Sequence, residues 1–165
     1  MDDALTVRLL YTTAIPLVTL VHELGHAVVP LLRTREPVTV DVGPGFSRPL
    51  FQVRAGRLTV VVRWLFFWGG QCDWQARLAP RQHFWAIAGG PLASGLMLGL
   101  GAAALIGIRT ETAWLVAQIF MILSFGQLLI TLWPMRYPTW LLGYAQTESD
   151  GAQLLRLWPR LRPAR

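Results

Sequence analysis

Two histidines and a glutamate interrupt an otherwise apolar stretch of the chain, residues 20–31, which reads LVHELGHAVVPL. His22 and His26 are four residues apart, so on a helix both imidazoles project from one face, about one turn from each other. Imidazoles at that spacing can bind one zinc ion, and Glu23 between them can act as a general base toward water. Ionisable side chains are costly in an apolar segment, which favours a functional site over simple hydrogen bonding between helices.

The third zinc ligand must come from elsewhere in the chain, because a catalytic zinc ion usually has three protein ligands. His83 begins another apolar segment, where an interfacial position beside Trp85 is the simpler interpretation. The single cysteine, Cys72, offers no cysteine-based metal site. The acidic candidates are Asp41 and Asp73, which we expect to be solvated, and Glu148 and Asp150.

Asp150 can reach the histidines only if residues 137–150 fold back toward them. Irregular backbone is tolerated at membrane depth where protein buries it. Gly151, the next residue, would ease a tight turn or a close backbone approach.

Long apolar segments must position these residues. Only 15% of the 165 residues are charged, whereas about a quarter are charged in a typical soluble domain. Three segments have the roughly 20 apolar residues that a membrane-crossing helix needs. They are residues 9–32, 84–108 and 113–134. We therefore expect a mainly α membrane protein in which residues 1–165 form one integral-membrane domain with three transmembrane helices.

The segment between the first two helices has a different pattern. Residues 37–42, PVTVDV, alternate apolar and polar side chains, and residues 50–64 resemble two short strands around an Ala-Gly turn. We expect a small β-sheet or hairpin within a cytoplasmic or interfacial insertion at about 37–76. Residues 135–165 are expected to form a re-entrant or interfacial segment, with a short amphipathic stretch after Asp150.

The arginines are distributed unevenly about these helices. All fifteen basic residues are arginine, and only Arg8 and Arg109 fall on the side of the N-terminus. The positive-inside rule then places residues 33–83 and the C-terminus in the cytoplasm and the N-terminus outside. We expect an integral protein of a prokaryotic cell membrane, whose basic tail contacts anionic lipid and not nucleic acid.

Small and polar residues in the second and third helices indicate helix packing. Gly95 and Gly99 form a small-xxx-small pair that allows close helix contact. Ser124, Gln127 and Thr131 follow one helical face, which we expect to point into the bundle. That face either forms hydrogen bonds between helices or lies near the site.

Taken in order, these motifs resemble those of the site-2 protease family of intramembrane metallopeptidases. The family's His-Glu-x-x-His motif matches residues 22–26, and its Ala-Gly-Pro-like turn resembles AIAGGPLAS at 86–94. Its Asn-x-x-Pro and Asp-Gly elements resemble TLWP at 131–134 and SDG at 149–151. The resemblance covers about residues 9–158, and Thr131 stands where the motif has asparagine.

The resemblance implies one zinc ion bound by His22, His26 and Asp150, with Glu23 as the general base. The expected reaction is hydrolysis of a peptide bond in or near a transmembrane segment of a membrane-protein substrate. Thr131 or Gln127 would help to polarise the scissile carbonyl group. An edge strand within residues 37–62 would hold the substrate extended by strand addition.

Two other interpretations remain open at this point. One is a non-catalytic relative, a membrane scaffold that binds transmembrane partners, with or without zinc. The other is an unrelated three-helix protein in which three matching elements coincide by chance. A binding protein has no need of Glu23, so replacing this residue distinguishes a protease from a scaffold.

Overall fold

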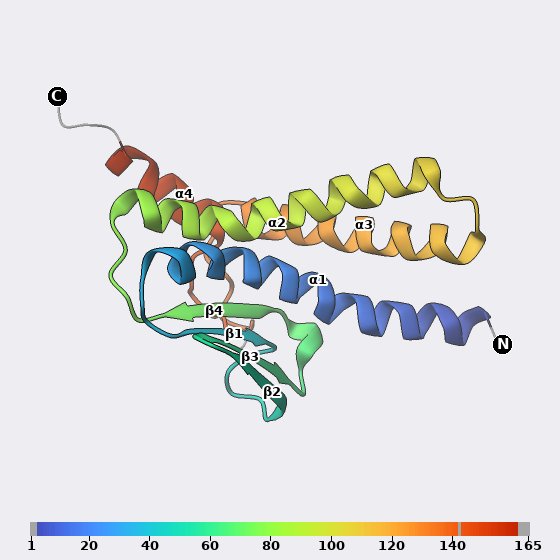
Figure 1. Cartoon of the computed structure of the whole chain (residues 1–165), viewed down its shortest axis with the longest axis horizontal. Coiled ribbons are helices and arrows are strands. Elements are labelled where there is room, and N and C mark those ends of the chain that lie inside the picture. Colours follow the sequence, from blue (N-terminus) through green and yellow to red (C-terminus); the bar gives the residue numbers. More distant parts are fainter. Residues whose placement is uncertain (1–2, 142, 162–165) are drawn as a thin grey trace.

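Three long helices run side by side, and a small sheet packs along the first of them (Figure 1). The computed structural model describes residues 3–141 and 143–161. The helices are α1 (Asp3–Arg33), α2 (Pro80–Gly107) and α3 (Glu111–Leu132). Among the described residues, these three helices are long and apolar enough to cross a membrane. With 60% of the residues helical, the predicted mainly α fold is confirmed.

The helix ends differ from the predicted ends for local reasons. Helix α2 begins at Pro80 and not at residue 84, because proline suits the first helical turn and a polar turn can precede the apolar run. Helix α3 ends at Leu132 and not at residue 134, because Pro134 disfavours helical backbone at Trp133, which is extended with ψ 118°.

Helices α1 and α2 touch at two glycines, and not at the predicted Gly95 and Gly99. A Cβ on Gly25 would lie 2.8 Å from the Ala93 Cβ and closer still to the Gly89 carbonyl oxygen. No atom lies within 4 Å of the Cβ position of Gly95 or Gly99. The small-xxx-small prediction was therefore wrong about which residues make the close contact.

The insertion forms a mixed four-stranded sheet with the order β2-β3-β1-β4. Strand β1 is parallel to β3 and antiparallel to β4, while β2 and β3 form an antiparallel hairpin. The predicted β-rich insertion is present, although its fourth strand was not predicted individually. The strands are β1 (Val38–Val42), β2 (Pro49–Ala55), β3 (Leu58–Arg63) and β4 (Gly70–Trp74).

The sheet is attached to α1 through its central strand. Val38 and Val40 are fully buried and pack against Ala27 of α1. Asp41 is also buried, at 5% exposed, and its carboxylate accepts a hydrogen bond of 2.6 Å from Arg63 Nε. The prediction that Asp41 is solvated was therefore wrong: its side chain is buried and paired with Arg63 of the neighbouring strand β3.

The chain after α3 folds back toward the helices, which Asp150 requires in order to reach the two histidines. Arg136 and Glu148 form an isolated antiparallel bridge that closes a loop between them. The Ser149 hydroxyl donates to the Trp133 carbonyl (2.7 Å) and caps α4 (Asp150–Leu157) by accepting from the Ala152 amide. A 3-10 helix (Trp158–Leu161) follows α4. Asp150 thus occupies the first turn of a capped helix beside the end of α3.

At Gly151 the backbone of α4 closely approaches the backbone of α3, as was expected for a glycine at this position. A Cβ at this position would lie 2.6 Å from the Leu132 carbonyl carbon, and closer still to its oxygen. Glycine therefore lets the start of α4 rest directly on the end of α3.

Candidate metal centre

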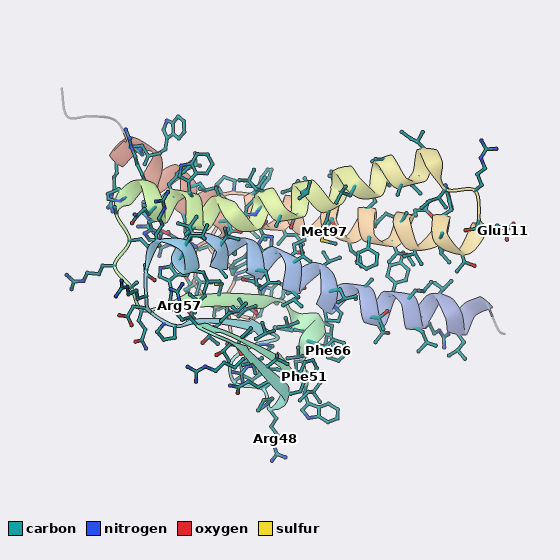
Figure 2. The ribbon with its side chains drawn as sticks, viewed as in Figure 1. Arg48, Phe51, Arg57, Phe66, Met97 and Glu111 are labelled. Atoms are coloured by element: carbon teal, nitrogen blue, oxygen red, sulfur yellow. The ribbon has the colours of Figure 1, made fainter. Side chains whose placement is uncertain are left out.

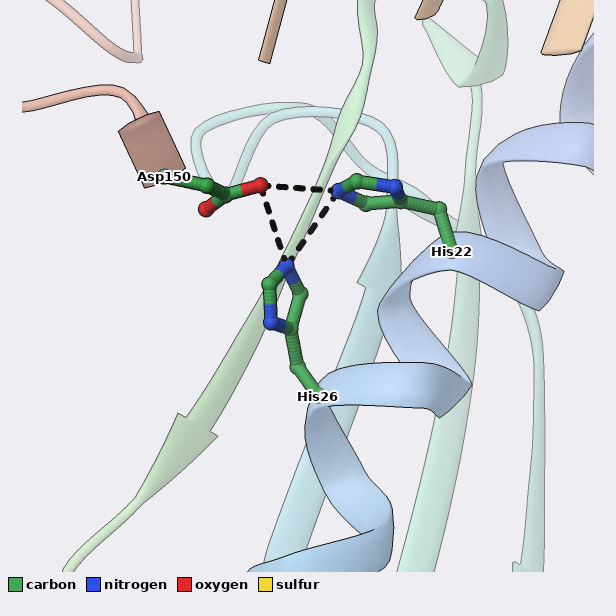
Figure 3. Close-up of side chains that lie close together, drawn as sticks. All are labelled: His22, His26 and Asp150. Atoms are coloured by element: carbon green, nitrogen blue, oxygen red, sulfur yellow. Dashed lines mark hydrogen bonds and ion pairs between the residues drawn. The ribbon is translucent and has the colours of Figure 1, made fainter. Parts of the chain in front are cut away.

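Three potential metal ligands converge from two distant parts of the chain (Figure 3). His22 Nε2 lies 3.2 Å from His26 Nε2 and 3.2 Å from Asp150 Oδ2. His26 Nε2 lies 3.5 Å from the same carboxylate oxygen. The structure thus brings together the three residues that were predicted to bind zinc.

Residues of α2 orient both imidazole rings through hydrogen bonds to their Nδ1 atoms. His26 Nδ1–H donates to the Ala86 carbonyl oxygen at 2.9 Å, because a carbonyl can only accept. His22 Nδ1 is hydrogen-bonded to the fully buried Ser94 hydroxyl at 2.8 Å. With Nδ1 engaged in this way, each ring presents Nε2 toward Asp150, and such outer contacts are typical of metal-binding histidines.

The arrangement fits a tetrahedral zinc ion. Ligands at about 2.0–2.2 Å from such an ion lie about 3.3–3.6 Å from one another, which is close to the measured 3.2–3.5 Å. Two imidazoles and one carboxylate are also a common donor set for catalytic zinc.

Gly90 of α2 leaves space beside these nitrogens. A Cβ on this residue would lie 2.8 Å from His22 Nε2 and 2.5 Å from His26 Cε1. The site therefore requires glycine at this position, which the sequence alone did not indicate.

Asp150 is ionised under the influence of its neighbours. Burial by itself raises the pKa of this carboxyl group, but the hydrogen bonds with His22 and His26 outweigh burial and hold its pKa below the ordinary value. A carboxylate is the form that binds metal, so this environment suits a ligand.

Glu23 lies on the same cavity wall as the three ligands. Its side chain is buried, at 6% exposed, and its carboxylate makes no hydrogen bond with any described residue. Gly70 of β4 makes room for it, since a Cβ there would lie 2.8 Å from Glu23 Cγ. The Glu23 side chain is therefore held next to the ligand cluster by close packing.

A cavity of about 890 Å³ opens in front of the ligands. It lies between α1, α3, β4 and the loop that precedes α4, and no described arginine lines it. Gln127 and Thr131 line the cavity, but neither Gln127 Oε1 nor Thr131 Oγ1 has a hydrogen-bond partner among the described residues. Of the two interpretations of this helical face, the contacts therefore favour proximity to the site.

The other candidate ligands lie outside the cluster. His83 lines the cavity, but its ring stands edge-on to Trp74 at 6.1 Å and not beside the metal ligands. Asp73 is exposed, as predicted, and accepts a hydrogen bond from Gln71. Glu148 forms ion pairs with arginines at positions 136 and 156.

No protein-family model matches the sequence, and a search of curated proteins finds no significant match. The functional argument therefore rests on the residues and geometry of the site.

Proposed function

We propose that the protein is an intramembrane zinc metalloprotease that hydrolyses a peptide bond in or near a transmembrane segment of a membrane-protein substrate. The observation that carries this proposal is the convergence of His22, His26 and Asp150 at zinc-ligand spacing, next to Glu23. These groups face one cavity beside three apolar helices, where a membrane-embedded peptide is the expected occupant.

Each polar group has a distinct role in the proposed reaction. Zinc, when bound, supplies a Lewis acid for the scissile carbonyl group and for water. Glu23 accepts the proton of the attacking water and then delivers it to the leaving amine. Thr131 reaches the cavity from α3, where its hydroxyl group can donate to the carbonyl oxygen as it gains negative charge.

We propose that β4, and not a strand within residues 37–62, holds the substrate. In that range only β2 is an edge strand, and it lines no part of the cavity. Strand β4 lines the cavity, and no described strand pairs with its other edge. The Gly43 amide donates to the Gly69 carbonyl, so the backbone groups of Gly69 point toward β1. Along an antiparallel strand, successive residues direct their backbone groups alternately toward and away from the partner strand. The backbone groups of Gly70, Cys72 and Trp74 therefore point away from β1, at the unpaired edge of β4.

A proline scan tests the β4 edge. Cys72→Pro removes an outward amide and should slow cleavage, while Gln52→Pro on the β2–β3 side should affect folding more than substrate binding. An unchanged cleavage rate in folded Cys72→Pro protein would rule out strand addition at this edge.

We propose that the three helices cross a prokaryotic cell membrane with the N-terminus outside. The N-terminus and the α2–α3 connection lie at one end of the helices, and α4 lies at the other (Figure 1). This arrangement supports the orientation inferred from the arginines. The 31 residues of α1 extend about 46 Å, which exceeds a hydrocarbon core of about 30 Å. The end of α1 that carries His26 can then reach the cytoplasmic interface.

The outer strand of the sheet supports an interfacial position. Strand β2 is exposed along its whole length, although it carries Leu50, Phe51 and Val53. Phe51 and the neighbouring Arg48 project away from the helices (Figure 2).

Protease digestion of terminal tags in spheroplasts tests the proposed membrane orientation. The N-terminal tag should be cleaved and the C-terminal tag protected. The reverse pattern would show that the orientation is inverted.

The zinc site is tested by the metal content of the detergent-purified protein. Wild type should contain close to one zinc ion per chain, and both His22→Ala and Asp150→Asn should lose it. His83→Ala and Asp73→Asn are matched controls, because both residues line the cavity outside the ligand cluster, and they should keep zinc. Folded wild type without zinc would contradict the proposal.

Catalysis is tested separately with Glu23→Gln, which should retain zinc and lose cleavage of a single-span reporter protein. If this variant keeps the full biological activity, the protein acts as a scaffold for transmembrane partners and not as a protease.

A further inference from the structure

Several buried polar atoms in the structure have no hydrogen-bond partner, and most of them face the same cavity. Buried polar groups are nearly always paired in proteins, so each exception needs an explanation. Three of them line the cavity in front of the candidate metal ligands. The unpartnered atoms of the described residues belong to Ser47, Ser124, Gln127, Thr131 and Tyr144, and the last three line the cavity.

Tyr144 reaches the cavity from the loop between α3 and α4. Its backbone is held by a hydrogen bond from its amide to the Leu141 carbonyl (3.0 Å) and by one from the Thr147 amide to its own carbonyl (2.9 Å). The preceding Gly143, with φ +91°, packs against Pro44 of the sheet insertion. The backbone that carries the phenol is therefore held from two sides.

The Tyr144 hydroxyl lies over the beginning of β4. A Cβ built on Gly69 would lie 3.2 Å from this hydroxyl oxygen and 3.4 Å from the ring carbon that carries it. Gly69 has φ +114°, so a side chain is disfavoured there and the approach stays open. Burial also raises the pKa of Tyr144, so the phenol remains a neutral donor. A chain added along the outer edge of β4 passes this hydroxyl.

Gln127 presents the complementary group from α3. Its side-chain oxygen is an unpartnered acceptor on the cavity wall. The adjacent Gly126 also lines the cavity, and no atom lies within 4 Å of its Cβ position. The wall beside Gln127 therefore has space for a bound chain.

We propose that Tyr144 and Gln127 bind the backbone of an extended peptide segment. The Tyr144 hydroxyl donates to a peptide carbonyl, and Gln127 Oε1 accepts from a peptide amide. A peptide backbone offers both groups at every residue except proline, whereas lipid chains offer neither. A helical segment keeps these groups in its own hydrogen bonds, so the ligand must be unwound. This inference rests on the proposed function and deepens it by assigning a substrate-binding role to Tyr144.

The test compares two zinc-binding probes on zinc-loaded protein in detergent: an N-acetyl-dileucyl hydroxamate, which carries peptide groups, and acetohydroxamate, which carries none. Loss of one neutral hydrogen bond weakens binding by about 3- to 10-fold. Tyr144→Phe and Gln127→Met should each weaken the peptidyl probe by about that factor and leave acetohydroxamate binding unchanged. Tyr11→Phe is the matched control, because Tyr11 does not line the cavity.

The outcomes separate this inference from the proposed function. If wild type binds neither zinc nor acetohydroxamate, the proposed function fails and the inference fails with it. If both probes bind through zinc but the peptidyl probe binds equally well to wild type, Tyr144→Phe and Gln127→Met, only the inference is overturned. A loss of zinc or of thermal stability in Tyr144→Phe assigns a structural role to the hydroxyl, and also overturns it.

Discussion

Gly90→Ala tests directly whether the space between the two histidines is a metal position. The added methyl group would lie 2.8 Å from His22 Nε2 and 2.5 Å from His26 Cε1. Ordinary contacts of this kind are about 3.4 Å or longer, so one imidazole must turn away. For His26 that movement breaks the hydrogen bond from Nδ1–H to the Ala86 carbonyl. The variant should therefore lose at least one nitrogen ligand.

The size of the effect follows from the number of ligands. Zinc sites with four protein ligands bind with about 10–16 kcal/mol, which is about 3 kcal/mol per ligand. Losing one ligand should weaken zinc binding by at least about 100-fold. The apoprotein should lose much less stability: overpacking costs about 1–3 kcal/mol, and the higher helix propensity of alanine offsets about 1 kcal/mol of this.

The assay measures zinc affinity by competition with a chelator, alongside thermal unfolding of the metal-free protein. Gly95→Ala is the matched control, because it makes the same change in the same helix with no atom within 4 Å of the new methyl group. The control should bind zinc as tightly as wild type. Wild-type zinc affinity in Gly90→Ala would refute the placement of a metal between these imidazoles.

Three further predictions concern the groups around the site. Gly151→Ala should weaken zinc binding, because its methyl group would push α4 and Asp150 away from the Leu132 carbonyl. Gly45→Ala is the control, since its methyl group meets no atom within 4 Å. Equal zinc affinities of the two variants would contradict this prediction. Ser94→Ala should weaken zinc binding by about 10- to 100-fold, because the hydroxyl orients His22; Ser124→Ala, which removes a buried hydroxyl without a partner, is its control. Cys72 should react with iodoacetamide at pH 8 more slowly than a cysteine introduced at the exposed Gly45. The reason is that burial and the nearby Glu23 raise the pKa of the Cys72 thiol. Equal reaction rates, measured by mass spectrometry, would show that the thiol is accessible and unperturbed.

The features that could be predicted from sequence depend on local patterns. The apolar lengths of the three helices are local, and so are the one-turn spacing of His22 and His26 and the alternation in β1. The parallel pairing of β1 with β3 depends on tertiary contacts, so the sequence did not indicate it. Strand β4 was missed because GQCDW has no clear alternation and begins with glycine.

Residues that act by leaving space were the hardest to predict. Small residues in α2 were interpreted as helix contacts at Gly95 and Gly99, whereas the contacts that matter are at Gly89 with α1 and at Gly90 with the histidines. Ser94 was seen only as a small residue, because nothing in a sequence shows that its hydroxyl meets a histidine 72 positions earlier. Tyr144 lies in an irregular loop, where no periodic pattern indicates which way a side chain points.

The donor atoms at the proposed site suit a zinc ion. Asp150 is held ionised by its contacts with the two imidazoles. No described arginine lines the cavity, so no fixed cation of that kind balances this carboxylate. A negative charge in a poorly solvated site is costly unless it is paired. A bound zinc ion would supply that pairing, and the hydrogen bond from His26 Nδ1–H to Ala86 leaves the Nε2 lone pair of a neutral ring for the metal. Two of the three ligand atoms are imidazole nitrogens, which suit zinc and similar transition metals. Sodium or potassium should therefore not replace zinc in restoring the stability of the metal-free protein.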